Sequence, residues 1–141
     1  MRTSLISLLF LLFSTMTFAQ ADNIIGIWLT QDKGAKVEIY KSNNQYFGKI
    51  VWLKDAVNTK TGKPWLDNQN PDATKRNLPL IGTMIIWNFN YSNVEYIGGK
   101  VYDSRNGKIY SGKLWLADNN TLKMRGYWGV FYNTETWKKL N

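Results

Sequence analysis

Hydrophobic and polar residues alternate with a period of two along much of the chain, most clearly around Asn106-Gly107. Between residues 94 and 116, two runs rich in β-branched and aromatic residues flank this pair, a pattern typical of a type I′ hairpin turn. Gly98, Gly99 and Gly112 interrupt the runs and permit the bends that a curved sheet needs. The stretch therefore predicts one β-hairpin within a closed or strongly coiled sheet.

Further strands are predicted where short runs with the same periodicity lie between turn residues. They are expected at residues 24–29, 36–40, 45–53, 78–89, 121–128 and 133–140. With the hairpin, the chain has about eight strands, short connections and no convincing helical pattern. The pattern predicts an all-β fold, a small up-and-down antiparallel β-barrel of about eight strands. A barrel of this size either encloses one small ligand or is filled by its own side chains.

The N-terminal segment has the organisation of a secretory signal peptide. Arg2 supplies a positive charge, residues 5–13 are apolar except for Ser7, and Ala19 is a small residue suited to cleavage. The apolar run is shorter than the roughly 20 residues that span a bilayer, and no later run is longer. We therefore expect a signal peptide at residues 1–19 and a single domain at residues 20–141. Because the chain has no cysteine for lipid attachment, the domain is expected to be periplasmic or secreted.

The net charge indicates which classes of partner to expect, and the length indicates the number of domains. Removal of Arg2 with the signal peptide lowers the formal net charge from +8 to +7. The excess favours anionic surroundings such as envelope polymers or acidic lipids, although lysines spread over strands and turns are also typical of a soluble β-protein surface. No block of like charges marks a nucleic-acid-binding arm, so we expect no nucleic-acid partner. The mature length suits one domain with its own core.

A long segment without strand periodicity, residues 54–77, follows the third predicted strand. Loops of this length are uncommon inside compact domains and are often functional, so we expect a mouth or lid here. With Asp103 from the hairpin, five residues of this loop are candidate ligand contacts: Trp65, Asp67, Asn70, Asp72 and Arg76. The alternative is structural, because loop Asp and Asn residues often cap turns, and Arg76 suits an ion pair that pins the loop.

The composition limits the available chemistry. The chain contains neither histidine nor cysteine, which excludes Ser-His-Asp and Cys-His nucleophilic sites and zinc sites built on these residues. Asp67 and Asp72 remain as a carboxylate pair for a hydrolase, because glycoside hydrolysis needs an acid and a base about 5 to 10 Å apart. The oxygen-rich segment 67–72 lacks the glycine and final glutamate of an EF-hand loop. We expect neither a metal nor another cofactor, and binding is favoured over catalysis.

The first predicted strand contains Gly26-Ile27-Trp28, which resembles the opening motif of lipocalin-type, or calycin, barrels. In that superfamily the tryptophan closes one end of the barrel, and a basic residue from a late strand packs over the indole. The resemblance implies that Trp28 closes this barrel, with Arg125 or, failing that, Lys138 as its partner.

A second resemblance covers nearly the whole mature chain. The order of its motifs is similar to that of the DUF2147 family of secreted bacterial proteins: Gly26-Ile27-Trp28, Tyr46-Phe47-Gly48-Lys49-Ile50, Asp67 with Asn70-Pro71, Leu80-Ile81-Gly82, Gly98-Gly99-Lys100-Val101-Tyr102-Asp103, Asn106-Gly107-Lys108, Tyr110, Leu122 with Arg125-Gly126-Tyr127, and Trp137. Members usually carry proline where this chain has Ser104. The resemblance implies a signal peptide and a calycin-like barrel, and it implies no catalytic residue.

Three hypotheses follow for function. The first is a barrel that binds a small apolar or amphipathic ligand, a glycan or another envelope component through the end covered by residues 54–77. The second is a solid barrel whose outer surface contacts other envelope proteins. The third is a carboxylate-based hydrolase. An outer-membrane barrel is disfavoured, because Lys36, Glu38, Lys49, Lys113 and Lys123 interrupt the outward apolar belt that it requires.

Overall fold

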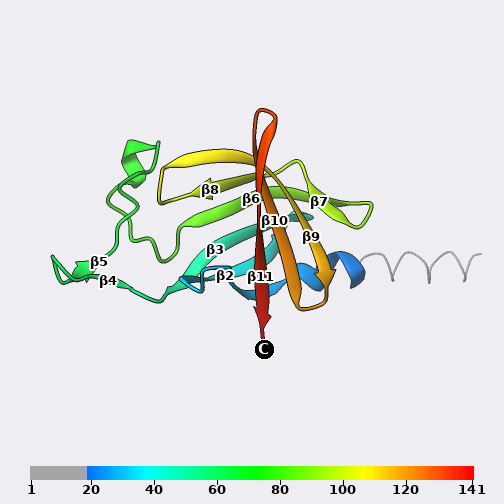
Figure 1. Cartoon of the computed structure of the whole chain (residues 1–141), viewed down its shortest axis with the longest axis horizontal. Helices are drawn as coiled ribbons and strands as arrows, with labels where there is room; N and C mark the ends of the chain where they lie inside the picture. The colour runs from blue at the N-terminus through cyan, green and yellow to red at the C-terminus, as the bar shows by residue number, and fades with distance from the viewer. Residues whose placement is uncertain (1–18) are drawn as a thin grey trace, which may run out of the picture.

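Strands dominate the computed structural model, which describes residues 19–141 (Figure 1). Eleven strands are found in these residues: β1 (Gly26–Leu29), β2 (Ala35–Ser42), β3 (Gln45–Leu53), β4 (Val57–Asn58), β5 (Lys63–Pro64), β6 (Met84–Ser92), β7 (Glu95–Ile97), β8 (Lys100–Asp103), β9 (Lys108–Asp118), β10 (Thr121–Trp128) and β11 (Phe131–Leu140). Two short 3-10 helices accompany them, η1 (Asp22–Ile24) before β1 and η2 (Ala73–Lys75) in the long loop. The predicted signal peptide lies almost entirely outside the described residues.

The main sheet closes on itself as an antiparallel barrel. Its strand order is β10-β11-β1-β2-β3-β6-β7-β9-β8, and additional pairings join β10 to β9 and β6 to β8. Because β7 and β8 both lie between β6 and β9, they occupy one position, and the ring has eight positions. The predicted all-β barrel of about eight strands is confirmed.

The hairpin around Asn106-Gly107 forms as predicted but with a different turn. Strand β9 pairs with β8 and β7, which are separated at Gly98-Gly99. Asp103 is opposite Lys108, so the loop has four residues, and within it only Gly107 has a positive φ, 72°. The predicted type I′ turn is therefore wrong. Side-chain caps favour the longer loop, because Asp103 accepts a hydrogen bond from the Arg105 amide and Asn106 accepts one from the Lys108 amide.

One end of the barrel is closed by η1 and the indole of Trp28. Trp28 is fully buried, and its Nε1 donates a 2.8 Å hydrogen bond to the Ile24 carbonyl. The Tyr46 hydroxyl donates to Asp22 at 2.7 Å, which ties η1 to β3. Tyr96 of β7 donates to the Ala21 carbonyl, so two buried tyrosines hold the plug in place.

The predicted contact between Arg125 and Trp28 is wrong. Alternation along β10 turns Arg125 to the outer face, where its guanidinium lies 5.0 Å from the Trp115 ring centroid. The cation over Trp28 is Lys139, the cross-strand partner of Trp28 on β11, with Nζ 5.4 Å from the ring centroid. Lys138, the other candidate, donates to Thr121 instead.

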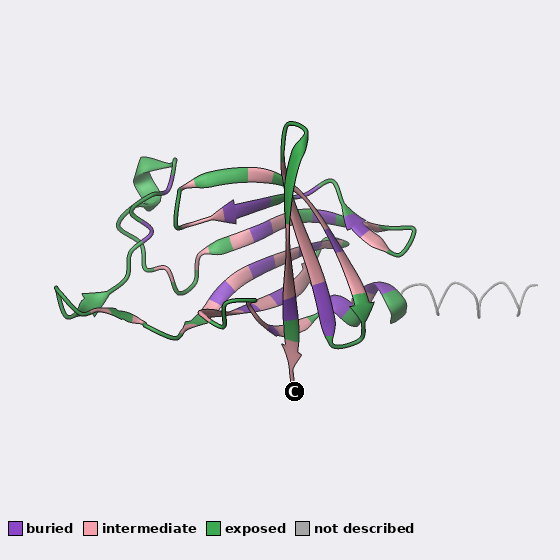
Figure 2. Ribbon diagram, in the orientation of Figure 1, coloured by how far each residue is buried: buried purple, intermediate pink, exposed green. Residues whose placement is uncertain are grey.

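The core occupies the middle and the closed end of the barrel, where buried and less buried positions alternate along the strands (Figure 2). Phe89 of β6 is fully buried at its centre. A Cβ atom at Gly99 would lie 2.3 Å from the Phe89 ring, so glycine is what admits the ring at this point. The large side chains of the core cluster thus fill the half of the barrel nearest η1.

The segment between β3 and β6 lies outside the barrel wall (Figure 1). Strands β4 and β5 pair only with each other, at Val57 with Pro64 and Asn58 with Lys63. The fourth predicted strand begins later than expected, at Met84, because Gly82 has a φ of 100° and ends the loop just before it. Among residues 19–141, no helix is both long and apolar enough to cross a bilayer.

Candidate functional site

A cavity of about 480 Å³ occupies the end of the barrel opposite η1. It lies where β1 and β2, β8 and β9, and β10 and β11 are joined, and where β3 ends. Its apolar and aromatic wall consists of Ala35, Ile50, Leu53, Leu80, Ile85, Val101, Tyr102, Tyr110, Met124, Trp128 and Trp137. Trp137 and Val101 also belong to the core cluster, so the filled half of the barrel forms the floor of the hollow half.

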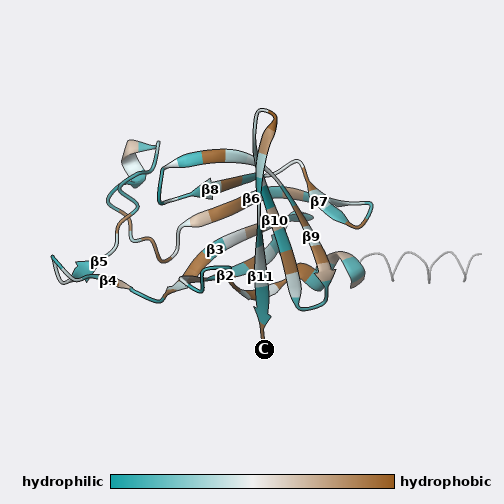
Figure 3. Ribbon diagram, in the orientation of Figure 1, coloured by the Kyte–Doolittle hydropathy of each residue, from teal (hydrophilic) through white to brown (hydrophobic). Residues whose placement is uncertain are grey.

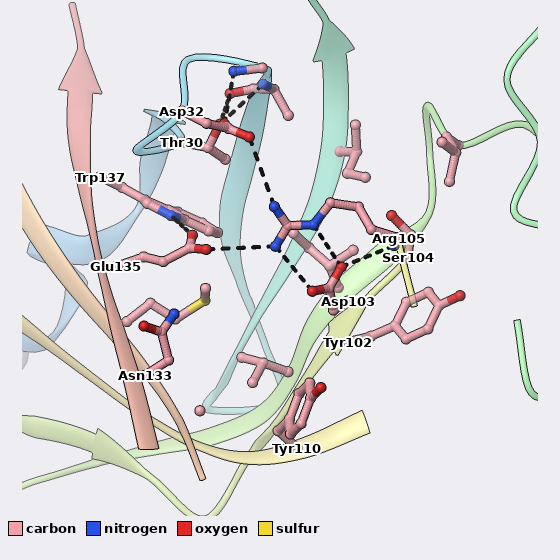
Figure 4. A pocket seen from close by; sticks show the side chains of 18 of the residues that line it. Thr30, Asp32, Tyr102, Asp103, Ser104, Arg105, Tyr110, Asn133, Glu135 and Trp137 are labelled. Carbon is pink, nitrogen blue, oxygen red and sulfur yellow. Dashed lines mark hydrogen bonds and ion pairs between the residues drawn. The ribbon is translucent and has the colours of Figure 1, made fainter. Parts of the chain in front are cut away.

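Four charged side chains meet in this cavity, with Arg105 at their centre (Figure 4). Its guanidinium donates two hydrogen bonds to Asp103, from Nε at 2.9 Å and from Nη2 at 3.0 Å. Nη2 lies 3.7 Å from Glu135 Oε1, and Nη1 lies 3.9 Å from Asp32 Oδ2. One cation therefore faces three carboxylates from three parts of the barrel. The cluster has an excess of negative charge.

The elements position these groups through strand periodicity and turn chemistry. Glu135 lies on β11 between Asn133 and Trp137, and all three point into the cavity because side chains alternate along a strand. The Trp137 Nε1 donates a 2.9 Å hydrogen bond to Glu135 Oε2, which orients the carboxylate. Asp32 is held in the β1–β2 connection by hydrogen bonds from Thr30 and from the Gly34 amide.

The charge pairing shifts the ionisation of these groups. Burial by itself raises the pKa of Asp103, but the hydrogen bonds and charge of Arg105 outweigh it and bring that pKa below its ordinary value. The hydrogen bond to Asp103 raises the pKa of Arg105. Hydrogen bonds from the Gly34 amide and Thr30 lower the pKa of Asp32. Asp32, Asp103 and Arg105 are therefore charged at neutral pH.

The predicted loop residues Asp67 and Asn70 form a buried hydrogen-bond network outside the cavity. Asp67 is 2% exposed and accepts from the Tyr102 hydroxyl at 2.6 Å and from Asn70 Nδ2 at 2.6 Å. Arg76 Nε donates to the Asn70 carbonyl at 2.7 Å. Burial and the hydrogen bond to Asp67 raise the pKa of Tyr102, so this hydroxyl remains a donor. The network fixes the loop to β8.

The remaining loop candidates, Trp65 and Asp72, also lie outside the cavity lining. Asp72 accepts hydrogen bonds from the amide and the hydroxyl of Thr74 and so caps η2. Trp65 is partly exposed on the loop. Of the six predicted ligand contacts, Asp103 alone lines the cavity, and within residues 54–77 no residue does so.

Sequence reasoning did not identify Asp32, Arg105 and Glu135. Asp32 lies in a polar turn, and Arg105 lies next to the predicted turn pair, so neither position carries a distinctive local signal. Glu135 could have been found, because the period of two places it on the same strand face as Trp137. In residues 19–141, no group of three or more acidic side chains is arranged to hold a metal ion. In the cavity, the Arg105 guanidinium lies between the three carboxylates.

Comparison with known proteins assigns the chain to a family. The family described as uncharacterized proteins conserved in bacteria, DUF2147, matches residues 26–139. The chain belongs to the DUF2147 family. A structure of protein HP1028 from Helicobacter pylori, described as belonging to the lipocalin family, is 25% identical, with a TM-score of 0.72, and the match covers 84% of this chain and 83% of that one. No curated protein matches the chain.

Four residues of the DUF2147 motifs, Asp67, Asn70, Tyr102 and Gly107, lie where the long loop docks onto the β8–β9 hairpin. Asp67 and Asn70 contact Tyr102 through the buried network. A Cβ atom at Gly107 would lie 2.1 Å from the Gln69 carbonyl, so the hairpin loop approaches this segment closely. These motif residues therefore position the rim of the cavity, and the lipocalin-like barrel supplies its walls.

Proposed function

We propose that this DUF2147 protein is an exported binding protein that holds a small apolar or amphipathic ligand in the cavity opposite η1. The apolar part of the ligand lies against the inward faces of β3, β6 and β10. Its polar group lies at the mouth, next to Arg105 and the three carboxylates. Export follows from the predicted signal peptide, and we place the mature protein in the periplasm or outside the cell.

The cavity is the observation that carries this proposal. Its volume of about 480 Å³ falls within the range of roughly 300–1,000 Å³ typical of small-molecule sites. Its lining also has the usual composition of such sites, since apolar and aromatic side chains surround a few convergent polar groups. The lipocalin-like fold supports the same function, because barrels of this size are able to hold one small ligand.

The two alternative functions have less support. A solid barrel would have its interior filled throughout, whereas the large side chains here fill only the half near η1. A hydrolase based on Asp67 and Asp72 would need these carboxylates free to act on a substrate. Asp67 is instead buried between Tyr102 and Asn70, and Asp72 caps η2.

Native mass spectrometry of the mature protein, purified from the periplasm of its own host, tests the proposal. A co-purifying small mass that is lost on denaturation and does not return on refolding identifies a ligand and its chemical class. The proposal would be overturned if the folded protein gave a bare protein mass and bound nothing in titrations against lipid and glycan panels.

A substitution inside the cavity connects binding to this site. A Cβ atom at Gly126 meets its nearest neighbours, Tyr110 and Val101, at 3.5 and 3.6 Å, so a leucine there extends into the cavity without a backbone clash. We expect Gly126→Leu to weaken binding of the uncharged dye N-phenyl-1-naphthylamine at least about tenfold, because it fills the space where the dye lies. Lys123→Leu, on the outer face of the same strand, is the matched control and should leave dye binding unchanged.

A further inference from the structure

The connection between β10 and β11 is exposed and apolar. Trp128 is opposite Phe131, so the hairpin turns through Gly129 and Val130, and Gly129 has a φ of 60°. Val130 is 89% exposed and Phe131 is 64% exposed. The tip projects beyond the rest of the barrel and is hydrophobic, with exposed residues on both strands (Figures 1, 2 and 3). Val130 is too exposed to contribute to the core of the barrel. Its side chain becomes buried only when another surface covers the tip.

The strands that lead to this tip carry a basic and aromatic outer face. The register of β9, β10 and β11 places Ser111, Tyr127 and Tyr132 in one row, Lys113, Arg125 and Thr134 in the next, and Trp115, Lys123 and Thr136 in a third. Arg125 lies 4.2 Å from the Tyr132 ring centroid and 5.0 Å from that of Trp115. Within these three rows no position is acidic. Lys113 is paired with Glu95 of the neighbouring strand β7 at 3.3 Å, so Lys123 and Arg125 supply the positive charge of this face beside the apolar tip.

We propose that the β10–β11 tip and this basic face dock onto an anionic lipid bilayer. Apolar residues at a projecting tip enter the interface between headgroups and acyl chains, while tyrosine and tryptophan favour the headgroup level. Lysine and arginine beside the tip are attracted to anionic headgroups. A soluble polyanion would satisfy the cations but would leave Val130 and Phe131 in water, which is why the bilayer is favoured.

The docking surface is separate from the cavity, although the two are adjacent. Trp128 lines the cavity and stacks on Phe131, with ring centroids 6.4 Å apart. Docking through the tip therefore brings the cavity mouth close to the lipid surface. Lipid binding by the tip needs no ligand in the barrel, so this proposal and the proposed function are tested independently.

Site-specific fluorescence tests the docking directly. Because the chain has no cysteine, Val130→Cys gives one labelling site for an environment-sensitive nitrobenzoxadiazole dye. We expect a blue shift and a rise in emission on addition of vesicles that contain phosphatidylglycerol, and little change with phosphatidylcholine alone. Val94→Cys is the matched control, because Val94 is 60% exposed in the two-residue turn between β6 and β7, near the η1 end. Its label should stay in water with both kinds of vesicle.

Vesicle sedimentation separates the contributions of the tip and the charge. Lys123→Gln with Arg125→Gln should lower partitioning into phosphatidylglycerol vesicles by roughly fivefold per cation removed. Lys36→Gln with Lys49→Gln, on β2 and β3 across the barrel, removes the same charge and should leave partitioning nearly unchanged. Val130→Ser with Phe131→Ser should weaken partitioning without a change in net charge.

Three results would overturn the proposal. A label at position 130 that remains in water with phosphatidylglycerol vesicles would show that the tip does not insert. An equal loss of partitioning in the Lys123→Gln/Arg125→Gln variant and in the Lys36→Gln/Lys49→Gln variant would assign binding to net charge rather than to this face. Binding of a soluble polyanion with unchanged response to the Val130→Ser and Phe131→Ser substitutions would favour a polymer as the partner.

Discussion

The carboxylate of Asp67 is almost fully buried, and the Tyr102 hydroxyl is one of its two side-chain hydrogen-bond donors. Tyr102→Phe removes this donor and leaves one carboxylate oxygen without that bond. We expect the free energy of unfolding to fall by about 1.5–3 kcal/mol, the usual range for a hydrogen bond to a charged group. Urea denaturation measures the loss, and hydrogen exchange should show faster opening of the loop around Asp67.

The control for this prediction is Tyr110→Phe. The Tyr110 hydroxyl accepts an exposed hydrogen bond from Asn106, so its removal leaves no buried group unpaired. A double-mutant cycle with Asp67→Asn should give a coupling energy for Tyr102 and none for Tyr110. Equal stability losses from the two tyrosine substitutions would show that the Asp67 contact does not fix the loop.

Ionisation of Asp103 connects stability to pH. Its folded-state pKa lies below the ordinary value of 3.8, with Arg105 as the cause that outweighs burial. Such a group stabilises the fold above its unfolded pKa, and the contribution is lost as the pH falls through the folded-state pKa. We therefore expect the stability difference between the wild type and Asp103→Asn to be larger at about pH 6 than at about pH 2.5.

Arg105→Gln supplies the second half of this test. Without the guanidinium, only the hydrogen bond from the backbone amide of residue 105 opposes the effect of burial on Asp103, so the pKa of the carboxyl should rise. NMR titration of the Asp103 side chain measures this shift directly. A pKa that stays low in Arg105→Gln would mean that another group stabilises the carboxylate, and the explanation through Arg105 would be wrong.

At the scale of the elements, the passage from β7 to β8 depends on Gly99. Its Cβ position lies 2.3 Å from the Phe89 ring, and its φ is not in the positive region, so the requirement for glycine is steric. We expect Gly99→Ala to destabilise the protein by about 1–3 kcal/mol through overpacking, measured by thermal or urea unfolding. Phe89→Leu should relieve part of that loss in the double variant. Gly126→Ala is the control, since its Cβ has ordinary contact distances and should cost little.

Strand positions were largely predictable from the sequence because they depend on local periodicity. The predicted strands at residues 45–53 and 121–128 coincide with β3 and β10, and the hairpin of residues 94–116 pairs as expected. The type I′ turn was wrong, because side-chain caps from Asp103 and Asn106 determine the loop and a dipeptide rule omits them. Local pattern thus identified the elements better than their connections.

The composition of the site was less predictable because it depends on barrel closure. Asp103 was a candidate, but Arg105, Asp32 and Glu135 come together only when the β1–β2 connection, the β8–β9 loop and β11 meet at one end. The packing of Lys139 rather than Arg125 on Trp28 likewise depends on the register of β1 with β11. Contacts between strands distant in sequence need that register, which no local pattern provides.

At the scale of the whole molecule, the barrel is divided into a filled half and a hollow half, and this division has a measurable consequence. Gly126 lies in the wall of the hollow half. Gly126→Ala changes the backbone entropy and strand preference, whereas Gly126→Leu adds apolar atoms that lie inside the cavity. Comparison of these two variants therefore isolates the effect of filling the space.

We expect Gly126→Leu to be more stable than Gly126→Ala by about 1 kcal/mol, because part of the added side chain is buried at roughly 0.8 kcal/mol per methylene. The same variant should lose dye binding, since stability and ligand occupancy use the same space. In a solid barrel the leucine would overpack and cost about 1–3 kcal/mol instead. Urea unfolding of the two variants, with dye titration on the same samples, distinguishes these outcomes. A stabilised variant that no longer binds shows that the empty volume is kept at the expense of stability, as expected for a binding site.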